Sequence, residues 1–177
     1  MWHFYPEHYM FSYQVVRILS QSHTGGGEVN EILEAASRIA PGDYESFHKS
    51  WMLTGERALT EANGALDRGH VVTARAAYLR AANYLRTAEF FLQPDDPRKL
   101  ETYLKGIEAF RKGASLLDRP PQIVQIPYEG SFLPGYFWKA ESEGPAPFAI
   151  MFGGLDSTAE ELYFGPAQYL NERGISL

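Results

Sequence analysis

The stretch "FAIMFGGLDSTAEELYF", residues 148–164, is the part of the sequence that decides the fold. It opens with an apolar run, residues 148–152, which is typical of a strand buried on both faces in a largely parallel sheet. Gly153 and Gly154 follow directly, and an acidic, hydroxyl-rich turn then leads into a segment with helical spacing. The pattern therefore predicts that a buried strand passes into a helix through a glycine turn.

The residues after the two glycines predict a helix over residues 158–173. Ser157 and Glu160 have the S-x-x-E spacing of a capping box, which marks a helix start. Gly174 suits the position after the last helical turn, where a left-handed backbone is common. The sequence "ISL", residues 175–177, then predicts the beginning of a further strand.

The residues before the stretch predict two more strands, over residues 123–128 and 133–140, because they are rich in β-branched and aromatic side chains. Glu129 and Gly130 would form the turn between them. The order β-β-β-α-β indicates the opening of an α/β sheet, with antiparallel first strands and then a right-handed crossover. A sheet cut off there leaves its last strand without an outer neighbour, so we expect a longer protein. A complete protein with a small mixed sheet is the alternative.

The first two thirds of the sequence have the spacing of amphipathic helices, interrupted by glycine and proline. Asp43 and Asp96 stand where N-caps are expected, and Pro97 suits the first position of a helix. On the first helix we expect Tyr9, Tyr13 and Val16 to face inward. The expected helices cover residues 6–21, 28–40, 44–68, 71–92 and 97–117. The expected buried residues on the next three helices are Val29, Ile32, Leu33, Ala36, Ile39, Phe47, Trp51, Leu59, Leu66, Ala74, Ala77, Tyr78, Ala81, Ala82, Leu85, Ala88 and Phe91.

The change of character predicts a boundary near residue 118, between an all-helical domain at 1–118 and an α/β domain at 119–177. With 45% hydrophobic residues the 177-residue chain has enough apolar material for a packed core. The net charge of −6, from 16 Lys and Arg against 22 Asp and Glu, argues against a nucleic-acid or anionic-membrane partner.

The chain has no cysteine, which excludes disulfides, thiolate metal sites and a cysteine nucleophile. Its histidines are scattered without metal-ligand spacing, so no metal site and no cofactor are expected. No apolar run approaches the roughly 20 residues of a membrane span, and the first residues lack the features of a signal peptide. We therefore expect a cytoplasmic protein.

The glycine turn is the candidate functional element. Glycines there permit a positive φ and let a ligand approach the backbone. Backbone N–H groups near a helix start, with the helix dipole behind them, favour a negative oxygen. The alternative is that the glycines only make a tight turn. A phosphate loop is disfavoured because neither G-x-x-x-x-G-K-[ST] nor G-x-G-x-x-G is present.

Three segments in this order resemble a known family: "SRIAPGDYESFHKSWMLTGERA" at 37–58, "GHVVTARAAYLRAANYLRTAEFFL" at 69–92 and "GGLDSTAEE" at 153–161. They are similar to α/β-hydrolases that carry an N-terminal helical domain. This group includes dihydroxypseudooxynicotine hydrolase and the fungal yellowish-green-type hydrolases, which shorten polyketide chains in pigment synthesis. The resemblance covers nearly the whole chain. It implies an α/β fold class, with an N-terminal helical cap domain followed by the first strands and helix of a truncated hydrolase core.

The resemblance implies a serine hydrolase that cleaves a C–C bond next to a ketone, or an ester, in a small aromatic molecule. A serine attacks the carbonyl and backbone N–H groups bind the oxyanion. By this resemblance Gly153, Gly154 and Leu155 form the oxyanion-hole loop, with Leu155 as a donor and Gly154 or Asp156 beside it. The helical domain would cover the active site. Members are often dimers, so a homodimer is also expected.

The chain departs from the family pattern because it has no G-x-S-x-G. Ser131 lies in a predicted hairpin turn and Ser157 in a predicted cap, so neither suits a nucleophile. We expect the serine, acid and histidine beyond Leu177, and we expect the fragment alone to be inactive. The alternative function is a helical interaction module, because "ARAAYLRAANYLRTAEFF" also resembles a tetratricopeptide helix. However, no second copy follows at a spacing of about 34 residues.

Overall fold

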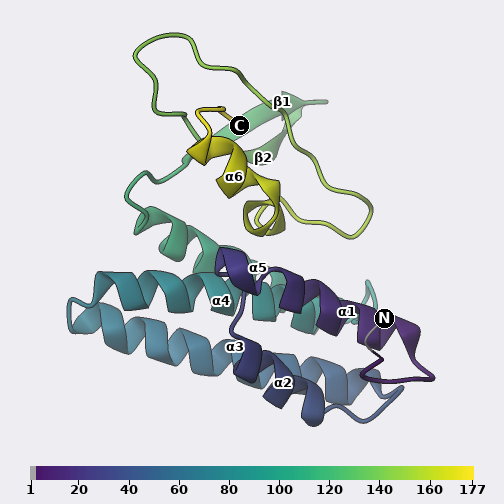
Figure 1. Ribbon diagram of the computed structural model, residues 1–177. Coiled ribbons are helices and arrows are strands. Elements are labelled where there is room, and N and C mark those ends of the chain that lie inside the picture. Colours follow the sequence, from purple (N-terminus) through teal and green to yellow (C-terminus); the bar gives the residue numbers. More distant parts are fainter. Residues whose placement is uncertain (1–2) are drawn as a thin grey trace. The chain divides into compact units, whose positions relative to one another are not determined.

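The computed structural model describes residues 3–177. They divide into two compact units, one ending at Leu116 and one comprising Leu117–Leu177. Figure 1 shows that the first unit is made of helices, whereas the second contains a small sheet and a short helix. Within the described range, no helix is both long and apolar enough to cross a membrane.

All the predicted helices of the first unit are present, and most are a few residues shorter than expected. Asp43 is confirmed as an N-cap, because its carboxylate accepts hydrogen bonds from the N–H groups of Glu45 (2.9 Å) and Ser46 (3.2 Å). Asp96 caps in the same way, and Pro97 is the first residue of the helix that follows. The helices are α1 (Tyr9–Ser20), α2 (Val29–Ser37), α3 (Tyr44–Asp67), α4 (Val71–Glu89) and α5 (Pro97–Ser115), with a short 3-10 helix η1 (Ser22–Thr24) after α1.

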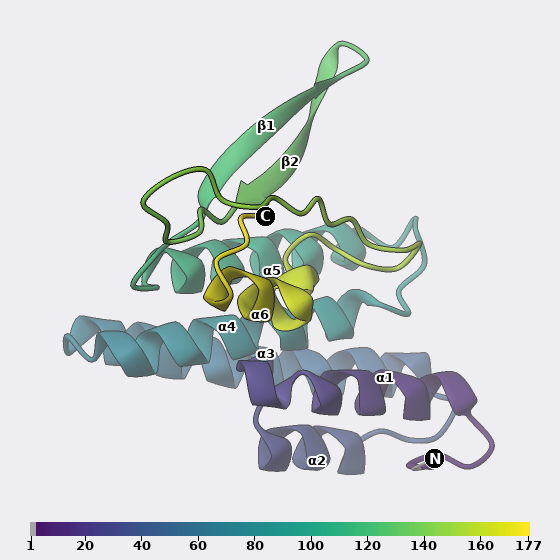
Figure 2. The same ribbon diagram turned by 45° about the horizontal axis from the view of Figure 1, so that its top comes forward.

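Small residues let α4 pack closely against α3 and α5; α3 and α4 run side by side in both ribbon views (Figures 1 and 2). A Cβ atom added to Gly55 of α3 would lie 3.0 Å from Cγ of Leu85, and one added to Gly113 of α5 would lie 3.1 Å from the backbone nitrogen of Leu79. The predicted stripe on α4 is confirmed as its buried side. Its fully or almost fully buried members are Ala74, Ala77, Tyr78, Ala81, Ala82, Leu85 and Ala88.

A partly buried polar network joins α2 to α3 and α4. The hydroxyl of Tyr84 donates to Glu31 (2.6 Å) and accepts from the N–H of Glu28 (2.8 Å). Arg80 donates to Glu31 (3.0 Å) and to Glu61 (2.8 Å). Burial raises the pKa of Tyr84 above its ordinary range, so the phenol stays a hydrogen-bond donor at neutral pH.

The predicted buried face of α1 is wrong. Tyr9 and Tyr13 are 53% and 42% exposed and stack on each other, with ring centroids 6.0 Å apart. The buried side instead carries Phe11, whose ring lies 4.9 Å from that of Phe47 and 5.0 Å from that of Phe91. Apolar residues occur on both sides of α1, so contacts with the other helices determine which side is buried. Val29, Leu33 and Leu66 are likewise more exposed than expected.

The second unit begins with the predicted hairpin, β1 (Gln122–Tyr128) and β2 (Ser131–Phe137), paired antiparallel (Figure 2). Glu129 has φ of 46° and Gly130 has φ of 78°. Left-handed backbone at both turn residues is typical of a two-residue hairpin loop of type I′. The predicted strands and their turn are confirmed, except that the second strand lies at Ser131–Phe137 rather than at residues 133–140.

The prediction of a strand buried on both faces over residues 148–152 is wrong for the described chain. Only an isolated parallel bridge joins Phe148 to Ser176, and Ile150 and Phe152 are 79% and 86% exposed. A strand is covered on both faces only when neighbours complete the sheet around it. Among residues 3–177, the segment at Ser176 is the neighbour that pairs with this run, as expected for "ISL".

The single helix predicted over residues 158–173 is also wrong. The segment forms a 3-10 helix, η2 (Glu161–Phe164), and then a short α-helix, α6 (Pro166–Glu172). Pro166 has no N–H and cannot continue a helix, so it starts a new one. The cap differs as well, because Thr158 rather than Ser157 accepts the hydrogen bond from the N–H of Glu161 (3.3 Å). Gly174 is confirmed as the helix stop, with φ of 78°.

The cap of α5 predicts a pH effect on stability. Hydrogen bonds from the side chain and backbone of Arg98 lower the pKa of Asp96 from 3.8 to about 2. A lowered folded-state pKa stabilises above the unfolded pKa, and the contribution is lost as pH falls from about 4 to about 2. We expect Asp96→Asn to flatten the change in unfolding midpoint over that range, measured by circular dichroism. The control Asp95→Asn should follow the wild type. Identical profiles for Asp96→Asn and wild type would contradict the assignment.

Candidate active site

The glycine turn after residues 148–152 is shaped by close packing. A Cβ atom on Gly153 would lie 2.3 Å from Cβ of Ser157, so only glycine fits there without movement. Neither Gly153 nor Gly154 has a positive φ, so that part of the expectation is wrong. Gly154 has open space where a Cβ would stand. The turn therefore needs Gly153 for proximity rather than for backbone conformation.

The backbone N–H groups of this turn are available to a ligand. Within residues 3–177, the N–H groups of Gly153, Gly154 and Leu155 donate no hydrogen bond. The carbonyl of Gly154 accepts from the N–H of Ser157 (3.3 Å), which closes the turn. The side chain of Leu155 is fully exposed. The three residues predicted for the site thus form one exposed turn whose donors are unused in this part of the chain.

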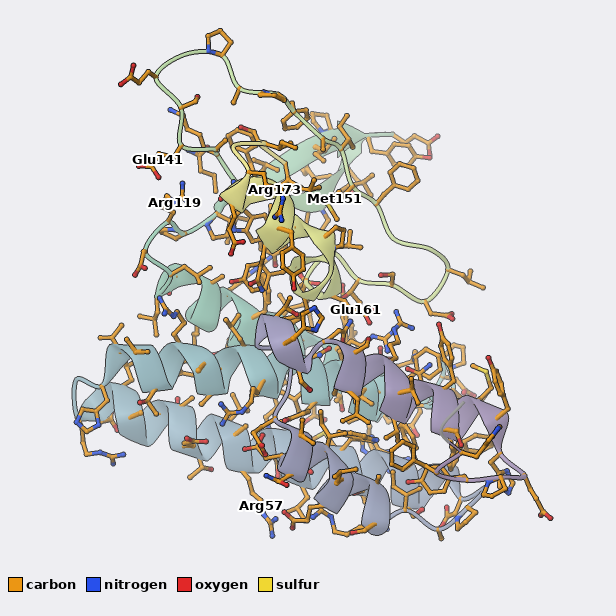
Figure 3. All side chains as sticks on the ribbon, viewed as in Figure 1. Arg57, Arg119, Glu141, Met151, Glu161 and Arg173 are labelled. Atoms are coloured by element: carbon orange, nitrogen blue, oxygen red, sulfur yellow. The ribbon has the colours of Figure 1, made fainter. Side chains whose placement is uncertain are left out.

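An apolar hollow lies beside the turn, entirely within the second unit. Its volume is about 590 Å³ and it includes Gly153 in its lining. Trp138 and Tyr163, stacked with ring centroids 5.5 Å apart, form part of the wall. Figure 3 labels Met151, another lining residue. A hollow with an apolar wall and a few polar groups at its edge is typical of small-molecule sites.

Hydrogen bonds place the end of the chain between two earlier segments. Trp138 and Leu177 exchange N–H to carbonyl bonds (3.0 Å each), and on the other side Ala149 donates to Ser176 (2.8 Å). Residues 148–152 and 175–177 thus run parallel at their point of contact. In open α/β sheets, ligands bind beyond the carboxyl ends of the parallel strands. Gly153 follows that end directly, which favours the turn as a ligand site.

Helix-dipole support for the turn is not found. The 3-10 helix η2 begins only at Glu161, and α6 begins at Pro166 and is short. The expected contribution of a helix dipole is therefore wrong. Only the N–H groups of the turn are left to stabilise a negative oxygen. In the described part of the chain, no group of three or more His, Cys, Asp or Glu side chains is arranged to hold a metal ion.

No sequence pattern marks a contact that joins the segment after the turn to β2. The hydroxyl of Tyr136 donates to a carboxylate oxygen of Glu160 at 2.6 Å. Glu161, next to it, is buried, and the hydroxyl of Ser157 donates to its carboxylate (3.4 Å). Figure 3 labels Glu161. Residues so far apart along a chain share no periodicity, so only the fold brings them together.

Comparison with known proteins agrees with this arrangement. No protein-family model matches the chain. The hydrolase acrC of Aspergillus aculeatus is 39% identical over 188 residues, which covers 96% of this chain and 44% of that protein. The α/β-hydrolase gkaG of Penicillium citrinum is 39% identical over 161 residues, covering 88% of this chain and 38% of that protein. The chain is thus similar, over most of its own length, to fungal α/β-hydrolases.

Two further comparisons extend the hydrolase relationship. The 20-hydroxy-prefusarin hydrolase of Gibberella moniliformis is 38% identical over 174 residues, covering 94% of this chain and 42% of that protein. The crystal structure of 2,6-dihydroxy-pseudo-oxynicotine hydrolase matches with a TM-score of 0.73 and 25% identity, covering 89% of this chain and 43% of that one. The resemblance and the fold class, a helical domain followed by part of an α/β-hydrolase core, are confirmed. The chain spans about two fifths of the length of these relatives.

Proposed function

We propose that the whole protein is a serine-dependent α/β-hydrolase acting on a small aromatic molecule. The reaction is cleavage of a C–C bond next to a ketone, or of an ester; both use the same kind of nucleophile and oxyanion hole. Residues 1–118 form its helical cap and residues 119–177 the first part of its core. The chain contributes the oxyanion-hole loop, and the nucleophile lies outside it.

The observation that carries this proposal is the set of unused N–H groups at Gly153, Gly154 and Leu155, next to an apolar hollow. When a nucleophile attacks a carbonyl carbon, the π electrons move to the oxygen, which becomes negative. Donors already fixed around that oxygen stabilise the tetrahedral intermediate more than the ground state. The N–H of Leu155, with that of Gly154 beside it, is assigned this role.

The relatives support a hydrolase over an interaction module. The hydrolase acrC matches 96% of this chain, so both the helical part and the glycine turn belong to the similarity. One relative is a 20-hydroxy-prefusarin hydrolase and the structural neighbour is a 2,6-dihydroxy-pseudo-oxynicotine hydrolase. By that likeness a small-molecule substrate is proposed for this protein. The homodimer and the cytoplasmic location stay predictions.

A serine-directed probe tests the proposal on the complete reading frame that contains this chain. We expect a fluorophosphonate to label one serine outside residues 1–177 and to abolish hydrolysis of an aryl ester or an aryl ketone. The chain of residues 1–177 alone should show neither labelling nor turnover, because it lacks the G-x-S-x-G elbow. Turnover that persists after complete labelling, or absence of labelling in an active enzyme, would contradict the proposal.

A further inference from the structure

The glycine turn is weakly held by its own backbone. In the described chain, the N–H groups of Gly153, Gly154 and Leu155 make no hydrogen bond, and the one backbone bond of the turn joins Ser157 to the carbonyl of Gly154. No helix begins directly at the turn to hold it. Oxyanion donors act only when they are fixed before the reaction. Something outside the turn has to hold these donors in place.

Side chains link the turn to β2 in a short series of contacts. Gly153 packs on Ser157 so closely that a Cβ atom would collide. Ser157 donates to the buried carboxylate of Glu161, whose N–H is bound by Thr158. Glu160, the residue before Glu161, accepts the short 2.6 Å hydrogen bond from the hydroxyl of Tyr136 on β2.

β2 is the hydrogen-bonded end of this series. Tyr136 pairs with Ile123 in the antiparallel ladder, and its ring lies 5.8 Å from that of Trp138. Trp138 is itself bonded to Leu177 through its backbone and stacks on Tyr163 of η2. Tyr136 therefore lies on a strand paired by backbone hydrogen bonds, whereas the donors lie on a turn whose N–H groups make none in the described chain.

We propose that Tyr136 and Glu160 are positioning residues, which hold the N–H groups of Gly153, Gly154 and Leu155 at the place where the oxyanion forms. The proposal rests on the proposed function. Glu160 is not among the residues that line the hollow, whereas Tyr136 is, and the role proposed for Tyr136 lies in its hydroxyl, which donates to Glu160. Their hydrogen bond fixes the start of η2, and through Ser157 it fixes Gly153. A displacement of about 1 Å of a catalytic group can lower the rate about a hundredfold. Loss of the Tyr136–Glu160 hydrogen bond should therefore reduce turnover without abolishing it.

Kinetics of the complete reading frame provide the first test. Tyr136→Phe removes the donor and Glu160→Leu removes the acceptor, and each should lower kcat by about tenfold with KM changed by less than about twofold. Glu160→Gln keeps an acceptor oxygen and should recover most of the activity. The kcat of the double variant should be no lower than that of the less active single variant, because both substitutions break the same contact.

The control variant is Glu141→Gln, which removes the ion pair with Arg119 (3.2 Å) elsewhere in the same unit and should leave kcat unchanged. Unchanged kcat in folded Tyr136→Phe and Glu160→Leu enzymes would overturn the proposal. So would losses that appear equally in Glu160→Gln, or effects of the two substitutions that simply multiply.

Nuclear magnetic resonance on glycine-labelled protein tests the same claim without catalysis. In the wild type we expect backbone order parameters near 0.85 for Gly153 and Gly154, falling below about 0.6 in Tyr136→Phe and Glu160→Leu but not in Glu141→Gln. Unchanged order parameters would overturn the positioning role. If the protein proves to hydrolyse nothing, the proposed function fails, and the order parameters alone decide whether Tyr136 and Glu160 hold the turn.

Discussion

The substitution Leu155→Pro is expected to lower kcat of the complete reading frame by about 100- to 1,000-fold, the usual effect of removing one oxyanion donor. Proline has no N–H, so this change deletes the proposed hydrogen bond. The side chain at position 155 is fully exposed, and its backbone does not have a positive φ. Gly154 tolerates the restriction that a following proline imposes, because it is glycine with open space around it.

Leu155→Ala is the matched control for the proline variant. It removes the same exposed side chain but keeps the N–H, so its kcat should stay close to that of the wild type. Steady-state kinetics with an aryl ester, together with circular dichroism to check the fold, measure both variants. Equal losses in the two variants would mean that the leucine side chain matters, and no loss in either would mean that this N–H is not a donor.

The substitution Trp51→Ala is expected to lower the free energy of unfolding of the helical unit by about 3–5 kcal/mol, as for other buried aromatic residues. The side chain of Trp51 is fully buried on α3. Its ring lies 6.2 Å from that of Phe47 and 5.9 Å from that of Tyr84 on α4. Alanine would leave a cavity between these helices, which cannot collapse completely because α3 and α4 are held at many other points.

Urea unfolding followed at the helical circular-dichroism band measures this loss without relying on tryptophan fluorescence. Leu53→Ala is the control on the same helix, since that side chain is 40% exposed, and it should cost less than about 1 kcal/mol. A loss below about 1 kcal/mol for Trp51→Ala would contradict the packing of α3 against α4.

The features that the sequence predicted correctly are local ones. The caps at Asp43 and Asp96 need only residues two or three positions away, and the hairpin turn needs only Glu129 and Gly130. The buried stripe of α4 was also predictable, because alanine and aromatic residues recur along it at helical spacing. In each case neighbouring residues contain the whole physical cause.

The features that were predicted wrongly, or not at all, depend mostly on distant partners. The inward side of α1 is chosen by contact of Phe11 with Phe47 and Phe91, which helical spacing alone cannot rank above Tyr9 and Tyr13. The tie between Tyr136 and Glu160 joins a strand to a turn, and no sequence pattern marks it. The division of the last helix has a local cause instead, because Pro166 lies within the predicted helix and interrupts it.

The most direct measurement follows the amide proton of Leu155 while an oxyanion forms. A trifluoromethyl ketone adds to a serine oxygen, and its carbonyl oxygen then carries the negative charge of a tetrahedral adduct. In leucine-labelled complete protein, we predict that the Leu155 amide proton moves clearly downfield when the adduct forms, because its N–H then donates a charge-assisted hydrogen bond. If the adduct forms and this resonance does not move, the oxyanion is bound elsewhere and the account is wrong.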